Sequence, residues 1–406
     1  CKTTAPRSTR RSKASLIMDK KRPSCYAPWV TTYEYSNGNI TPCCEWNSNL
    51  LTIKTNEHMS FEERFNHPIT QKIKDELLNS SKLPSACKNC AVLEQNNQSS
   101  LRTQLNERID RTERTTAWKF DKDQFNLFHM DYRESNLCNF SCMMCGSGLS
   151  STHAKIDGVY GKTGILNNHH ELAQYLDNLD DVQIIHFLGG EPLLTDAMWT
   201  TLKEVKRRGL ERQMDISIVT NGSLLHRNKD NLIDLLEGFH FVDIAVSIDC
   251  IGDQHNYWRQ KNTWAQVEAN CKILYEWKQG KDNVHCAIRT AICWPNAYAA
   301  RDVFDRFKDM DVEMRWNLVT NPIGLSLPML PQEDLEKLAE HWKDYPDVAE
   351  VFANTVSYPN MFHMVSEVLK LDRVQNTRDL TFKQVFPKLI HVYNKVSKNK
   401  NNPYLG

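Results

Sequence analysis

The stretch LCNFSCMMC, residues 137–145, contains the strongest chemical signal in the sequence and decides which fold we expect around it. Its cysteines are spaced C-x3-C-x2-C, at Cys138, Cys142 and Cys145. Clustered thiolates are soft ligands that suit iron–sulfur clusters or zinc. A structural zinc site normally has four protein ligands. Three cysteine ligands instead leave one iron of a four-iron cubane open for a substrate or cofactor.

Outward from the triplet, six short apolar runs alternate with longer amphipathic stretches. The runs are residues 124–132, 182–189, 214–222, 241–249, 284–292 and 312–319. This alternation predicts parallel strands joined by helical crossovers. In α/β barrels the loops after the strands build the active site. The triplet, the GGEP turn at 189–192, TNG at 220–222 and SIDC at 247–250 all lie at or just after such runs.

These motifs, in this order and spacing, resemble those of radical S-adenosylmethionine (radical SAM) enzymes over roughly residues 125–320. The resemblance implies an α/β fold with a partial (β/α)6 barrel, in which Cys138, Cys142 and Cys145 hold a catalytic [4Fe–4S] cluster. It also implies reductive cleavage of SAM to a 5′-deoxyadenosyl radical, which abstracts a hydrogen atom from the substrate. One departure is Met144, where the family usually has an aromatic residue. The residues expected at the SAM site are Met144, Gly189, Gly190, Glu191, Pro192, Asn221, Ser247 and Asp249.

Each motif outside the triplet also has a structural interpretation. Glu191 and Pro192 suit the first turn of a helix. Asn221 with Gly222 suits a plain turn. Ser247 and Asp249 are ordinary polar residues for a strand end.

A second group of cysteines precedes the barrel. Two strands joined at Asn37-Gly38 predict a hairpin that brings Cys25 close to Cys43, and a helical stretch is expected around 61–80 before the C-x2-C at 87–90. This order resembles the auxiliary-cluster module of SPASM and Twitch radical SAM proteins. The resemblance implies a second [4Fe–4S] cluster, and Cys44 is an alternative to Cys43. Four thiolates fit structural zinc equally well. The expected ligands are Cys25, Cys43, Cys87 and Cys90.

The chain divides into four expected regions. Residues 1–24 form a basic, disordered leader; 25–115 the cysteine-rich auxiliary domain; 116–330 the barrel; and 331–406 a C-terminal helical extension. The 406 residues include 50 basic and 50 acidic side chains, so no global charge favours nucleic acid. No apolar run is long enough to span a membrane. Thirteen cysteines grouped at ligand spacing indicate metal binding in a reducing cytoplasm.

The substrate is predicted to be a peptide or protein, by analogy with auxiliary-cluster enzymes. Dehydrogenation or epimerisation of a small metabolite such as a carbohydrate is the enzymatic alternative. A zinc or iron–sulfur scaffold or electron carrier is the non-enzymatic one. An electron donor such as flavodoxin or ferredoxin is the expected partner. Cys250 and Cys293 are candidate hydrogen donors, and Arg259, Arg289 and Arg315 are candidates for binding a substrate anion or for ion pairs.

Overall fold

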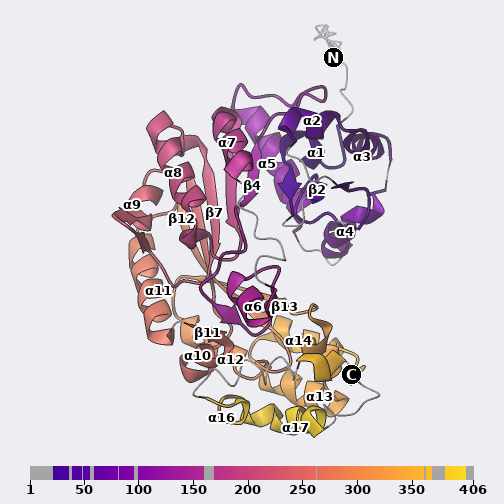
Figure 1. Cartoon of the computed structure of the whole chain (residues 1–406), viewed down its shortest axis with the longest axis vertical. Helices are drawn as coiled ribbons and strands as arrows, with labels where there is room; N and C mark the ends of the chain where they lie inside the picture. The colour runs from indigo at the N-terminus through magenta and orange to yellow at the C-terminus, as the bar shows by residue number, and fades with distance from the viewer. Residues whose placement is uncertain are drawn as a thin grey trace, which may run out of the picture.

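The computed structural model describes residues 22–35, 39–47, 49–54, 59–80, 82–95, 99–159, 169–261, 263–360, 363–367 and 380–398. A cysteine-rich unit precedes a curved parallel sheet with helices on its outer face, and a group of helices follows it (Figure 1). Among the described helices, none combines the length and the apolar character needed to cross a bilayer.

The central sheet has six parallel strands in the spatial order β13-β12-β10-β7-β6-β4. Each strand therefore lies beside the next one in the chain, as right-handed crossovers produce. All six predicted strands are present, which confirms the partial α/β barrel. The strands are β4 (His129–Arg133), β6 (Ile184–Leu188), β7 (Asp215–Thr220), β10 (Phe241–Ser247), β12 (Val284–Ile292) and β13 (Glu313–Leu318).

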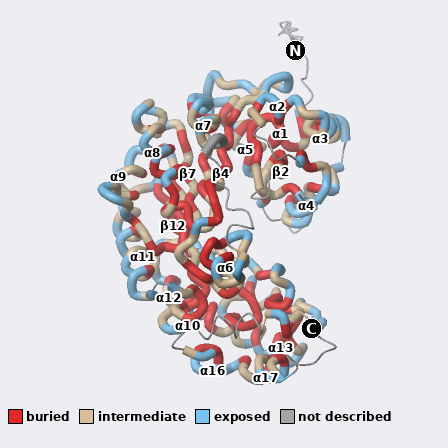
Figure 2. The backbone as a smooth tube through the Cα atoms, in the orientation of Figure 1, coloured by how far each residue is buried: buried red, intermediate tan, exposed pale blue. Residues whose placement is uncertain are grey.

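Helices cover the convex face of this sheet (Figure 1). Along β7 the burial alternates, so that Ile216 and Ile218 are buried while Ser217 is half-buried. The buried set packs against apolar side chains of the helices in one core, drawn as red tube in Figure 2. The helices are α7 (His169–Asp177), α8 (Asp196–Arg208), α9 (Leu232–Leu236), α11 (Trp264–Lys278) and α12 (Ala300–Phe307).

Shorter elements complete the barrel. Two of them, β5 (Ser141–Cys142) and β11 (Arg259–Gln260), pair antiparallel beyond the ends of the main strands. The others are α6 (Ser151–Ile156), β8 (His226–Arg227), β9 (Asp230–Asn231) and α10 (Gly252–Trp258).

The N-terminal unit departs from the expected hairpin in detail. Its strands pair antiparallel with Tyr33 opposite Thr41, but residues 27–30 are helical and a third strand at 53–54 joins the sheet. The Asn37-Gly38 turn lies outside the described residues. The helical stretch expected around 61–80 consists of two helices, because Pro68 has no N–H to continue the first and begins the second. The elements are α1 (Ala27–Val30), β1 (Tyr33–Glu34), β2 (Asn39–Thr41), β3 (Ile53–Lys54), α2 (Phe61–Asn66), α3 (Pro68–Asn79), α4 (Lys88–Gln95) and α5 (Leu101–Thr115).

The expected leader is described only from residue 22 onward. There Arg22 pairs with Glu113 of α5 at 2.6 Å, and the Ser24 hydroxyl donates to the Leu77 carbonyl at 3.0 Å. Residues 22–24 are therefore attached to the cysteine-rich unit, and 1–21 lie outside the described residues.

The C-terminal helices pack on one end of the barrel. Trp294, which follows β12, and Trp342 are fully buried in a shared core with these helices. This agrees with the expected helical extension. The helices are α13 (Gln332–His341), α14 (Pro346–Asn354), α16 (Phe382–Val385) and α17 (Ile390–Lys398).

Candidate active site

The cysteine triplet lies in the loop that follows β4. Strand β5 includes Cys142, and its partner β11 places Arg259 directly opposite. The Cys145 N–H donates to the Cys142 carbonyl at 3.0 Å, which folds the last two ligands into one tight turn. All three cysteines are partly exposed.

Helix α6 holds this loop by its first turn. The Thr152 hydroxyl donates to the Cys138 carbonyl at 2.7 Å, and the Ser150 hydroxyl to the Phe140 carbonyl at 2.9 Å. His153 Nε2 lies 2.6 Å from the Cys142 carbonyl. Contacts with the protein therefore hold the backbone carbonyls of Cys138, Phe140 and Cys142 in place.

The three thiols are close enough to influence one another. Burial raises the pKa of the Cys138 thiol to about 12, and the neighbouring Glu191 and Cys145 contribute to this rise. Burial also raises the pKa of Cys142, where Cys138 and Cys145 add to the effect and Arg259 opposes it. Three partly exposed thiols that interact with one another are the donor set expected for a cluster in which each thiolate binds a different iron. Cluster binding must overcome these raised pKa values by displacing the protons.

The GGEP turn packs directly against the same loop. The Gly190 N–H donates to the Ser135 carbonyl at 3.1 Å, and the Glu191 N–H to the Leu137 carbonyl at 2.7 Å. A Cβ atom on Gly190 would lie 2.3 Å from the Leu137 oxygen and 2.5 Å from the Asn136 oxygen. Glycine at 190 is therefore required for the turn to approach the cysteine loop this closely.

Glu191 is fully enclosed at the centre of the site. Its Oε1 accepts from the Thr220 hydroxyl at 2.7 Å and from the Leu193 N–H at 3.2 Å, and its Oε2 accepts from the Asn221 N–H at 2.7 Å. It also caps the short 3-10 helix Pro192–Leu194, so the structural interpretation of this motif is correct. A carboxylate can accept about four hydrogen bonds, and the three accepted here leave room for an ammonium donor. Burial raises the pKa of Glu191 to about 7, so a cation would be favourable. Its contact with SAM stays a prediction.

Asn221 connects the end of β7 to the cysteine loop. Its side-chain amide donates to Asn139 Oδ1 at 2.8 Å, and its own oxygen accepts from the Ser223 N–H at 2.9 Å. Asn139 in turn donates to the Ser223 hydroxyl at 2.9 Å. Asn221 therefore forms a turn, as its structural interpretation from the sequence predicts. This turn supports the cysteine loop between two of the expected cluster ligands.

The strand-end residues of β10 differ from each other. Ser247 is half-buried at the carboxyl end of the strand. Asp249 is fully buried: its Oδ2 accepts from Arg259 Nε at 2.7 Å and its Oδ1 from the Ala291 N–H at 2.8 Å. The predicted contacts of both with SAM stay predictions, but Asp249 is already engaged by protein groups.

Several other expected site residues are now located. Pro192 is buried in the 3-10 helix, and Met144 packs at the edge of the C-terminal core. Cys250 and Cys293 are fully buried, and the Cys293 thiol donates to Asn296 Oδ1 at 3.3 Å. This enclosure favours the alternative that both are buried core thiols.

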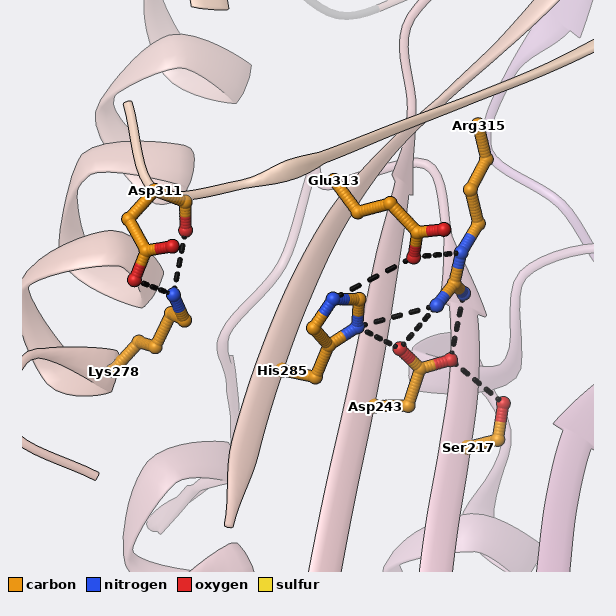
Figure 3. Close-up of polar contacts among 7 residues, drawn as sticks. All are labelled: Ser217, Asp243, Lys278, His285, Asp311, Glu313 and Arg315. Atoms are coloured by element: carbon orange, nitrogen blue, oxygen red, sulfur yellow. Dashed lines mark hydrogen bonds and ion pairs between the residues drawn. The ribbon is translucent and has the colours of Figure 1, made fainter. Parts of the chain in front are cut away.

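A row of charged residues lies on the sheet face opposite the helices, nearer the amino ends of the strands (Figure 3). Asp243 accepts from Arg315 Nη1 at 2.8 Å and faces His285 Nδ1 at 2.7 Å. Burial opposes ionisation of Asp243, yet the hydrogen bonds from Arg315 and His285 lower its pKa. Arg315 therefore forms an ion pair, which is one of the two roles that the sequence suggests for it.

The N-terminal cysteines converge as well. Cys25, Cys43, Cys87 and Cys90 line one cavity, together with Arg102. Burial raises the pKa of Cys87 to about 12, with Cys25 and Cys90 adding to the effect. Cys44 does not line this cavity; its thiol faces Asp131 of β4 instead. Four thiols are the donor set that a fully ligated cluster or a structural zinc ion would need.

No group of three or more His, Cys, Asp or Glu side chains in the described ranges is placed so that it could hold a metal ion. The role of every cysteine as a ligand stays a prediction.

From the sequence, Arg259 is a candidate for binding a substrate anion or for an ion pair, but no contact with the cysteine loop is indicated. Arg259 is buried against Asp249, and its Nη1 lies 3.8 Å from the Cys142 sulfur. The available signal was its position ten residues after Asp249, just beyond the SIDC motif. That spacing does not by itself reveal a contact with the distant cysteine loop.

Comparison with known proteins gives one family match. The model of the radical SAM superfamily matches residues 134–287. No curated protein matches the chain.

Among solved structures, the chain is similar to native anSMEcpe with bound AdoMet at 20% identity and a TM-score of 0.39, covering 60% of this chain and 66% of that one. The complex of native anSMEcpe with AdoMet and the Cp18Cys peptide gives 19% identity and a TM-score of 0.38, with 60% and 66% covered. Streptococcus suis SuiB bound to S-adenosylmethionine gives 17% identity and 0.37, with 64% and 57% covered. The chain thus spans just under two thirds of anSMEcpe.

Proposed function

Because residues 134–287 match the radical SAM superfamily, we propose that the chain is an enzyme that cleaves SAM reductively and modifies a peptide or protein. Members of the superfamily use a [4Fe–4S] cluster and SAM. The observation that carries the proposal is the convergence of the cysteine loop, the GGEP turn and the end of β7 on one another.

The triplet provides the proposed ligands of the catalytic cluster. When bound, the cluster would supply the electron for reductive cleavage of SAM, and the substrate would lose a hydrogen atom to the 5′-deoxyadenosyl radical. Glu191 would accept the methionine ammonium through the capacity that its three protein hydrogen bonds leave free. Gly189, Gly190, Asn221 and Ser247 would shape the remainder of the SAM site. An external donor such as flavodoxin or ferredoxin would supply the electron.

The cavity near the N-terminus supports a proposed auxiliary [4Fe–4S] cluster. Its four cysteines would ligate every iron, which favours electron transfer or structure over substrate binding. Zinc is the alternative occupant of the same donor set. We propose that this unit, residues 25–115, forms a domain separate from the barrel at 116–330.

A long cleft supports a polymeric substrate over a small metabolite. The cleft has a volume of about 1210 Å³, whereas small-molecule sites usually measure about 300–1,000 Å³. One wall is β13, the last strand of the sheet, and the opposite wall is α14. Three acidic side chains line it together with one basic side chain, Arg315, which pairs with Glu313 at 2.7 Å. The remaining acidic residues, Asp347 and Glu350, suit a segment with basic side chains.

Anaerobic reconstitution tests the chemistry. Two four-iron clusters predict about eight irons and eight sulfides per chain, whereas zinc at the auxiliary site predicts about half of this. Dithionite and SAM should then yield 5′-deoxyadenosine. Cys142→Ala should abolish that product, while Cys90→Ala should retain part of it. A fully iron-loaded wild-type protein that forms no 5′-deoxyadenosine would leave only the scaffold or electron-carrier alternative.

Isotope transfer tests the substrate class. Peptides deuterated at their side-chain carbons are incubated with the reconstituted enzyme, and deuterium is then measured in 5′-deoxyadenosine. Label from a basic peptide, at a higher level than from an acidic peptide of equal length, supports the proposal. Label from a deuterated carbohydrate and from none of the peptides supports the metabolite alternative.

A further inference from the structure

Arg259 lies beside the cysteine loop because the backbone places it there. Strand β11 pairs with β5 so that Arg259 is opposite Cys142. The Met143 N–H donates to the Trp258 carbonyl at 3.0 Å, which extends the same ladder. The backbone pairing thus places Arg259 next to the middle cysteine of the triplet.

The side chain of Arg259 is held in one orientation. Its Nε donates to Asp249 Oδ2 at 2.7 Å, and the two side chains are 9% and 0% exposed. Asp249 is itself anchored by the Ala291 N–H at 2.8 Å and by Asn296, which donates to the Asp249 carbonyl at 3.3 Å. From this anchored position the guanidinium directs Nη1 toward the Cys142 sulfur, 3.8 Å away.

A buried ion pair of this kind is weak evidence for a role in stability. The desolvation cost of two buried charges often cancels their attraction, so apolar replacements are frequently neutral or stabilising. The ion pair of Arg259 and Asp249 nevertheless has an effect that an apolar pair could not have. It keeps a positive charge, with an N–H donor, against one sulfur of the triplet.

We propose that Arg259 is a positioning residue that raises the reduction potential of the cluster bound by Cys138, Cys142 and Cys145. The inference rests on the proposed function and adds a means of controlling it. Reduction adds one electron and forms or breaks no bond at Arg259. The added negative charge is stabilised by the nearby guanidinium, and the hydrogen bond to the Cys142 sulfur acts in the same direction. The negative charge of Asp249 opposes part of this effect. Its hydrogen bond to Arg259 supports the effect, because it holds the guanidinium in place.

The expected effect follows from the distance. An opposite charge within about 4–6 Å shifts a protonation equilibrium by about ten- to a thousandfold. The electron added here spreads over a whole cluster, so we take the lower limit of that range. Arg259→Gln should therefore make reduction of the cluster about tenfold less favourable, which corresponds to about 59 mV for one electron.

The test is a redox titration of the reconstituted full chain without SAM, in which the EPR signal of the reduced cluster is measured at each potential. Every variant also carries Cys90→Ala, so that the signal comes from the cluster at the triplet. Arg259→Gln should shift the midpoint downward, and Arg259→Lys should restore most of the shift because it keeps the charge. Asp249→Asn should shift it upward, because the guanidinium then loses its countercharge. Arg306→Gln is the matched control, since Arg306 pairs with Glu268 between α11 and α12 and should not change the midpoint.

Opposite shifts from the two members of one ion pair are not expected of a merely structural pair. Equal midpoints in the wild type, Arg259→Gln and Asp249→Asn overturn the inference even if the wild type cleaves SAM. Should Arg259→Gln fail to bind iron, Asp249→Asn decides: an upward shift supports the inference, and an unchanged midpoint overturns it. A wild type that binds no cluster at the triplet overturns the proposed function and this inference together.

Discussion

Gly190→Ala is the substitution for which the structure gives the sharpest expectation. A Cβ atom at this position would lie 2.3 Å from the Leu137 carbonyl oxygen and 2.5 Å from that of Asn136, where ordinary contact begins at 3.4 Å. Both obstacles are backbone atoms in the loop that leads into the cysteine triplet. The methyl group therefore has to displace either the GGEP turn or the cysteine loop by roughly 1 Å.

The cost can be worked from two contributions. Inserting a methyl group into a packed site typically costs about 1–3 kcal/mol. The displacement also weakens the hydrogen bonds from Gly190 to Ser135 and from Glu191 to Leu137, each with a net value of about 1 kcal/mol. We expect a total of about 2–5 kcal/mol, which lowers the Tm of a barrel of about 200 residues by at least roughly 4 °C.

Gly148→Ala is the matched control, because it lies in the same loop and its added Cβ would meet nothing within 4 Å. Both variants are compared with the wild type by thermal unfolding followed by circular dichroism, and by iron content after reconstitution. Gly190→Ala should lower both the Tm and the iron content, and Gly148→Ala should lower neither. If the Tm values of the two variants agree within about 1 °C, the close approach of turn and loop is wrong and so is the site geometry built on it.

The six strands were predictable because each is a short apolar run between amphipathic stretches, and four of them are followed by a motif with special chemistry. In β10, for instance, Val242 and Ile244 face the helices while Asp243 faces away. Local pattern was enough for this, since strand order then follows from the crossover rule. The break at Pro68 was also legible in the sequence, because proline cannot continue a helix.

Long-range partners were not predictable in the same way. The contact between Arg259 and Cys142 joins residues 117 positions apart, and nothing local to either residue specifies it. The choice between Cys43 and Cys44 was left open for a related reason. The two residues lie in a bend and turn that follow β2, where no simple periodicity sets side-chain direction. Only the packing of the N-terminal unit determines that Cys43 faces the cavity and Cys44 faces Asp131.

Two further predictions concern the N-terminal unit. Cys43→Ala should remove the auxiliary iron measured after reconstitution, whereas Cys44→Ala should retain it; equal losses would contradict the assignment of the cavity. Lys74 is the second case, because its ammonium lies among aromatic rings, 3.3 Å from the centroid of Phe65 and 5.8 Å from that of Trp29. Burial lowers the pKa of Lys74 from 10.5 to about 8, so the unfolded chain binds a proton more readily than the folded one. Lys74→Met should therefore raise stability at pH 7 by about 1–2 kcal/mol, allowing for solvent screening and the lost cation–π contact. The gain should be complete below pH 8 and should disappear as the pH rises toward 10.5, where lysine is neutral in both states. Urea unfolding of the wild type and the variant across this range measures it, and a gain that stays constant from pH 7 to 10.5 would show that the buried charge is not its cause.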